Sequence, residues 1–147
     1  MEEEVKMASL KYKRYILTEL KLPEEIREKE AHYNRWAGHL LWLDDHVIEG
    51  APFVNTAWYF KPEPDVVLAH THDFDEIVGF FGSDSRNPHD LGGEIEFWLE
   101  DEKYILKNSC LIFIPKGMKH CPERVLKVER PIFHVSLANV VQYSKNR

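Results

Sequence analysis

Three histidines and one glutamate stand in a pattern that could bind a metal ion. His70, His72 and Glu76 lie close together in the chain, and His120 follows much later. In an extended strand, residues i and i+2 point to the same face, so the first two imidazoles can converge on one ion. The turn-forming residues 73–75 would return the Glu76 carboxylate beside these two rings.

His120 is expected to reach the same place from a second strand. The apolar run Leu111–Ile114 ends at Pro115-Lys116-Gly117, which is a turn signal. A reversal there would bring His120 to face the same interior. The alternative for any one of these histidines is an ordinary hydrogen-bonded core residue. Burying three imidazoles and a carboxylate together without a cation costs on the order of several kcal/mol, which favours a metal site.

The donor set narrows the choice of metal. Three nitrogen donors and one oxygen donor suit one divalent transition metal per chain, with Mn, Fe, Co, Ni, Cu and Zn all left open, and calcium and magnesium prefer oxygen shells. An octahedral ion held by four protein ligands keeps two positions for water or substrate. That arrangement is typical of a catalytic site and favours an enzyme.

The elements that must position these residues are strands. From Trp36 onward, short apolar runs alternate with turn residues, which is typical of an all-β sandwich or barrel. Ile95, Phe97 and Leu99 alternate with polar residues and give one strand a core face. We expect strands at Gly38–Leu43, Phe53–Phe60, Val66–His72, Glu76–Phe81, Glu94–Leu99, Lys103–Leu106, Cys110–Ile114, His120–Val125 and Ile132–Leu137.

The chain length suits a single domain with an extension. Residues 1–35 are rich in lysine and glutamate, and Leu22–Glu30 predicts a short helix with proline in its first turn. We expect this partly helical extension to pack outside a β-barrel domain over 36–140, followed by a tail over 141–147. The segment Gly82–Gly93 predicts a long loop, either a surface hairpin or a lid.

Charge and composition exclude several classes of partner. The net charge is −6 and no Lys/Arg cluster is interleaved with aromatic residues, which argues against nucleic acid. The N-terminus does not resemble a secretory signal and no apolar run is long enough for a membrane span, so we expect a cytoplasmic protein. Cys110 and Cys121 lack CxxC spacing, in keeping with a reducing compartment. Strand alternation predicts that Cys121 turns away from the face of His120.

Side chains for substrate contact follow from strand parity. Trp58 and Phe60 share one face of their strand and Tyr59 takes the other, so one group lines the barrel, although parity does not say which. Arg124 is a candidate for attracting an anionic substrate. His134 in the last strand is a candidate catalytic base or, alternatively, a hydrogen-bonded structural residue.

The chain resembles the cupin superfamily. The family's first motif centres on HxH followed by Glu, matched by His70, His72 and Glu76, and its second on PxG followed by His, matched by 115–117 and His120. The resemblance implies a jelly-roll β-barrel that holds an ion inside and pairs as a homodimer.

Two functions remain as hypotheses. The first is a metal-dependent enzyme that acts on a small polar molecule, such as a hydroxy or keto acid, by oxygenation, isomerisation, decarboxylation or lyase chemistry. The second is a sensor or binding module that holds a small ligand at the metal without turnover. An ion that only braces the barrel is a third possibility, which metal removal would distinguish.

Overall fold

A computed structural model describes residues 10–140 of the chain. The predicted tail over 141–147 and the first nine residues of the predicted extension lie outside the described residues. Among the described helices, none has the length and apolar character that crossing a bilayer requires.

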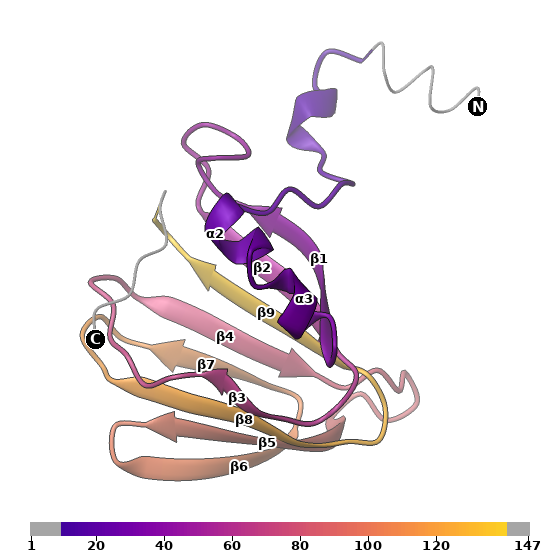
Figure 1. The fold of residues 1–147 in the computed structure, drawn as a ribbon, viewed down its shortest axis with the longest axis vertical. Coiled ribbons are helices and arrows are strands. Elements are labelled where there is room, and N and C mark those ends of the chain that lie inside the picture. The colour runs from indigo at the N-terminus through magenta and orange to yellow at the C-terminus, as the bar shows by residue number, and fades with distance from the viewer. Residues whose placement is uncertain (1–9, 141–147) are drawn as a thin grey trace.

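The described residues form two antiparallel sheets that face each other, as Figure 1 shows. The five-stranded sheet has the order β1-β2-β9-β4-β7, and the four-stranded sheet has the order β3-β8-β5-β6. The predicted all-β jelly-roll class is confirmed. The strands are β1 (Ala37–Leu43), β2 (Phe53–Tyr59), β3 (Glu63–Val67), β4 (Glu76–Phe81), β5 (Asp90–Leu99), β6 (Glu102–Asn108), β7 (Cys110–Ile114), β8 (His120–Val128) and β9 (Ile132–Ala138).

Alternation along the strands builds a core between the two sheets. On β5, Ile95 and Phe97 are almost fully buried, and on the facing sheet Val78 and Phe80 are buried as well. The glutamates between the inward residues of β5 stay partly exposed. Every second residue of β5 therefore faces the core, as the alternation in the sequence predicted, and the residues between them face solvent.

Two of the predicted segments differ most from the structure. The strand expected over Val66–His72 is shifted, because β3 ends at Val67 and only an isolated bridge forms at His70. The predicted loop over Gly82–Gly93 is shorter, because β5 already begins at Asp90. Gly82 permits this, since a Cβ atom there would lie 1.9 Å from the Asp90 carbonyl oxygen.

The N-terminal extension is helical in short pieces and packs beside β1 and β2 (Figure 1). It contains the 3₁₀ turn η1 (Lys13–Tyr15) and the helices α2 (Glu24–Arg27) and α3 (Glu30–Tyr33), where one helix over Leu22–Glu30 was predicted. Leu22 is buried with Trp42 and Phe53 in a second apolar cluster and anchors the extension.

Candidate metal centre

Backbone hydrogen bonds join the two segments that carry the four predicted ligands. The amide of His70 donates to the carbonyl of His120 at 3.1 Å, and the reverse bond is 3.0 Å long. The amide of Gly117 donates to the carbonyl of His72 at 2.9 Å. Gly117 has φ +83°, a left-handed conformation that glycine adopts without strain. The predicted turn over 115–117 thus ties the second segment directly to the first.

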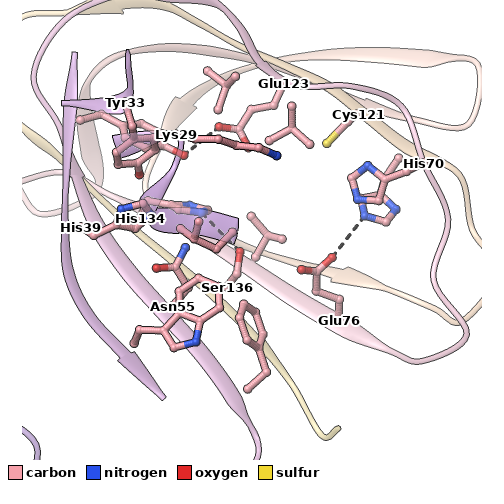
Figure 2. Close-up of a pocket in the computed structure, with 18 of the residues that line it drawn as sticks. Lys29, Tyr33, His39, Asn55, His70, Glu76, Cys121, Glu123, His134 and Ser136 are labelled. Atoms are coloured by element: carbon pink, nitrogen blue, oxygen red, sulfur yellow. Dashed lines mark hydrogen bonds and ion pairs between the residues drawn. The ribbon is translucent and has the colours of Figure 1, made fainter. Parts of the chain in front are cut away.

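The three imidazoles and the carboxylate meet in the interior. One nitrogen from each histidine lies within 4.8 Å of the others. The Nε2 atoms of His70 and His72 are 3.1 Å apart, and Glu76 Oε1 lies 3.3 Å from His72 Nε2 and 3.2 Å from His120 Nε2. All four side chains are buried. Figure 2 shows Glu76 and His70 at the same end of the cavity.

The protons of two rings are fixed by the backbone. His70 Nδ1 donates to the Leu68 carbonyl at 2.6 Å, and His120 Nδ1 donates to the Met118 carbonyl at 3.0 Å. A carbonyl can only accept, so Nδ1 carries a proton in both rings, and Nε2 of each ring faces the cluster.

This arrangement fits a cation. His120 Nε2 is buried and makes no hydrogen bond among the described residues, although the Glu76 carboxylate is near. Nε2 of His70, Nε2 of His120 and the Glu76 carboxylate thus converge on one buried point. A histidine that binds a metal through one ring nitrogen usually donates a hydrogen bond from the other, and this bond fixes the orientation of the ring. The donor set therefore suits the divalent transition metals predicted from the sequence.

The Glu76 carboxyl is held ionised. Burial alone would raise its pKa, but pairing with His120 and His72 outweighs burial and lowers the pKa to about 2. A carboxylate that stays charged at neutral pH is in its metal-binding form.

A cavity of about 490 Å³ opens beside the cluster. At one end its wall includes His70, Glu76 and His120. The rest of the wall is formed by inward-facing strand residues and by the α2–α3 segment. These lining residues include Glu25, Ile26, Lys29, Tyr33, His39, Asn55, Tyr59, Cys121, Glu123, His134 and Ser136.

The predicted substrate contacts divide between the inside and the outside of the barrel. Tyr59 is buried and lines the cavity, so its face is the inner face of β2. Trp58 packs against Phe133 on the outer face, and Phe60 is 51% exposed. Arg124 forms an ion pair with Glu96 outside the cavity. Of the two alternatives that strand parity left open, the structure thus places Tyr59 at the cavity wall, and it places Trp58, Phe60 and Arg124 outside the cavity.

His134 lines the cavity with both ring nitrogens in use. Its Nδ1 donates to the Gly79 carbonyl at 3.1 Å, and the Ser136 hydroxyl lies 3.3 Å from its Nε2. The ring also stacks on Tyr59 and Phe80. Burial lowers the pKa of His134 to about 4, so the ring is neutral at pH 7. These contacts favour the structural alternative over the catalytic base.

Sequence reasoning missed two groups of lining residues. Glu123 and Cys121 line the cavity because the backbone of β8 departs from regular alternation, and Cys121 was expected to turn away. The α2–α3 segment contributes Lys29 and Tyr33, although it was expected to pack outside the barrel. The spacing of apolar and charged residues in 24–33 carried no signal for this contact.

Comparisons with known proteins find similarity in structure only. No protein-family model matches the sequence, and no curated protein matches it. A recombinant oxalate oxidase solved in complex with glycolate superposes with a TM-score of 0.56 and 12% identity over 95% of this chain. A second oxalate oxidase structure superposes with a TM-score of 0.50 and 12% identity over 75% of this chain. This chain spans 66% and 54% of those two proteins.

These similarities identify the class of fold. Two facing antiparallel sheets with the strand order given above define a double-stranded β-helix, or jelly roll. The chain shares this fold with the two oxalate oxidase structures, and it is the fold that the resemblance of its two motifs to the cupin superfamily implied.

Proposed function

We propose that the protein is a mononuclear metal-dependent enzyme that acts on a small hydroxy or keto acid. The observation that carries the proposal is the convergence of His70, His72, Glu76 and His120, whose buried Nε2 atoms and carboxylate oxygen lie within about two metal–ligand bond lengths of one another, with the Glu76 oxygen 3.3 Å from His72 Nε2 and 3.2 Å from His120 Nε2. A divalent transition metal would satisfy all four groups at once.

The four residues would hold the ion, and the cavity would hold the substrate. A bound divalent metal supplies Lewis-acid polarisation of a carbonyl or hydroxyl oxygen. The chain's own contribution is to orient the imidazoles through the Leu68 and Met118 carbonyls and to keep Glu76 charged.

The choice of substrate class has two supports. Lys29 offers one positive charge to an acid group in a cavity wall that also contains Glu25, Glu76 and Glu123. The oxalate oxidase with the similar fold was solved with glycolate, a two-carbon hydroxy acid. Glycolate, oxalate and longer hydroxy acids are therefore the first compounds to test.

The test begins with metal content and continues with turnover. Elemental analysis of the purified protein identifies the native metal, and the loaded protein is then incubated with hydroxy and keto acids in air and under nitrogen. We expect about one metal per chain and conversion of at least one acid. Oxygen consumption would identify an oxygenase, and conversion without oxygen would identify an isomerase, decarboxylase or lyase. A metal-free protein would contradict the proposal.

A non-catalytic binding module is the second candidate function. It is favoured by His134, the candidate base predicted from the sequence, because both of its ring nitrogens are engaged in hydrogen bonds. Saturable binding of an acid by the loaded protein, with no product after prolonged incubation, would select this alternative.

We also propose that the protein forms a homodimer through the five-stranded sheet. Its edge strand β7 exposes Leu111 at 67% and Phe113 at 59%. An exposed apolar edge strand is a site for association. Light scattering should give a dimer for the native chain and a monomer for the Leu111→Glu, Phe113→Glu variant. Leu126→Glu, on the other sheet, is the matched control and should stay dimeric.

A further inference from the structure

A short segment of the N-terminal extension bridges the two sheets at the cavity. β1 is an edge strand of the five-stranded sheet, β3 is an edge strand of the four-stranded sheet, and both strands contribute residues to the cavity wall. The helices α2 and α3 complete this wall with Glu25, Ile26, Lys29 and Tyr33. The segment that carries the two helices therefore covers one side of the cavity.

This segment, residues 23–35, is anchored at its two ends. Leu22 and Trp36 are buried, and the Trp36 carbonyl accepts hydrogen bonds from the amides of Phe60 and Lys61 at 2.8 and 3.1 Å. Within 23–35 no residue is buried, and α2 and α3 are four residues long each. A single helical turn is unstable by itself, and a segment with little buried apolar surface opens locally at low cost in free energy.

Two histidine–glutamate pairs connect the middle of the segment to the two edge strands. On β1, His39 Nδ1 donates to Glu30 Oε1 at 2.6 Å, and the His39 ring stacks on Tyr33 with 4.0 Å between the ring centroids. On β3, Glu63 Oε2 lies 3.6 Å from His32 Nε2. Figure 2 shows His39 and Tyr33 across the cavity from the imidazole cluster. Side chains thus hold α3 to both sheets.

The two pairs differ in their surroundings. The His39 and Glu30 side chains are 6% and 20% exposed, and a carboxylate can only accept, so this short bond is charge-assisted and largely shielded from water. The His32 side chain is exposed, and solvent therefore weakens its attraction to Glu63. The bond between His39 and Glu30 contributes more to the closed position of the segment.

We propose that residues 23–35 form a lid over the cavity, which moves about its anchors at Leu22 and Trp36 and is held closed by the bond between Glu30 and His39. Small molecules enter and leave the cavity when the lid opens. The lid is a property of the cavity and the extension, so it does not depend on a metal in the imidazole cluster.

Two thiols of the chain allow the opening of the lid to be measured. Cys121 lines the cavity and is 4% exposed, whereas Cys110 on β7 is half-buried and is not part of the cavity wall. Iodoacetamide is small compared with the cavity volume of about 490 Å³. Its rate of reaction with Cys121 should follow the fraction of molecules in which the lid is open. Mass spectrometry of peptides gives a separate rate for each thiol.

The test compares these rates in the native protein and in three variants. Glu30→Ala removes the acceptor of the His39 bond and should raise the rate at Cys121 about 10-fold, with the rate at Cys110 unchanged. Glu63→Ala removes the weaker pair and should raise the rate at Cys121 about two-fold. Glu28→Ala changes an exposed glutamate of the same segment and is the matched control, which should keep the native rate.

Two results would overturn the lid. An unchanged rate at Cys121 in Glu30→Ala would mean that small molecules reach the cavity by another route. An equal acceleration at Cys110 would mean that the whole barrel opens rather than the segment 23–35. If Glu30→Ala does not fold, Glu63→Ala makes the same comparison with Glu28→Ala at its smaller amplitude. The measurement uses neither metal nor turnover, so failure of the lid leaves the proposed function untouched.

Discussion

The two polar ends of the cavity are buried to a similar degree but differ in their hydrogen bonding. At the imidazole cluster, His120 Nε2 has no hydrogen-bond partner among the described residues, and neighbouring Nε2 atoms lie 3.1 Å apart. On the other wall, the Tyr59 hydroxyl donates to Glu123 and both nitrogens of His134 are in use.

This difference in hydrogen bonding distinguishes the candidate metal site from the part of the cavity wall that has a structural role. Groups that satisfy one another, such as His134 and its partners, hold the wall in place and need no further ligand. Three imidazole nitrogens and a carboxylate that converge on one buried point are a donor set that could hold a cation. Burial of a histidine is therefore not by itself evidence of metal binding. The convergence of several ring nitrogens and a carboxylate on one point is such evidence.

The largest expected effect is loss of metal on removal of one imidazole. His72→Ala should reduce metal content from about one per chain to well below a tenth, while the barrel stays folded because its core lies elsewhere. Elemental analysis and circular dichroism measure the two quantities. The matched control, His134→Gln, removes a histidine from the satisfied wall and should keep the metal. Equal metal loss in both variants would contradict the difference proposed between the imidazole cluster and the wall that contains His134.

The pH dependence of stability should come in part from His134. Its pKa is lowered to about 4, so between pH 6.5 and 4 the unfolded chain binds a proton there that the folded chain does not. Stability is complete above pH 6.5 and is lost as the pH falls, by about 3 kcal/mol in total for this residue. Urea unfolding at pH 7 and at pH 5 should show a smaller loss in His134→Gln. An identical loss in the variant would contradict the assignment.

Metal removal should destabilise the native protein by about 3 kcal/mol when the metal had been present at a hundred times its Kd. Thermal unfolding before and after a chelator measures this change. The same treatment of His72→Ala should leave its melting temperature unchanged, since that variant has no metal to lose. A chelator effect of equal size in both proteins would mean that the ion binds elsewhere.

A smaller effect is expected from the bond between Tyr59 and Glu123. Tyr59→Phe removes one donor to a buried carboxylate and should cost about 1 to 3 kcal/mol of unfolding free energy. The matched control is Tyr104→Phe, because the Tyr104 hydroxyl donates to Glu102 on the exposed surface. That variant should change by less than about 0.5 kcal/mol. Similar losses in the two variants would show that burial does not strengthen the bond.

Much of this arrangement could be predicted from the sequence, because strand alternation and the HxH spacing are local. The predicted ranges of β4 and β7 agree with the structure, and the four predicted ligands lie together. Glu123 could not be predicted, because the reversal at Cys121 places it on the inner face against strict alternation. The face of β2 that points inward is decided by the side on which the second sheet packs, and strand parity does not show this side. The inward position of Tyr59 could therefore not be predicted.

The central claim is that one metal ion sits among His70, His72, Glu76 and His120. Anomalous diffraction at the absorption edge of the native metal tests it most directly. We predict one strong peak per chain, within about 2.0 to 2.3 Å of the three Nε2 atoms and a Glu76 oxygen. A peak elsewhere, or none in a protein that elemental analysis shows to be loaded, would contradict it.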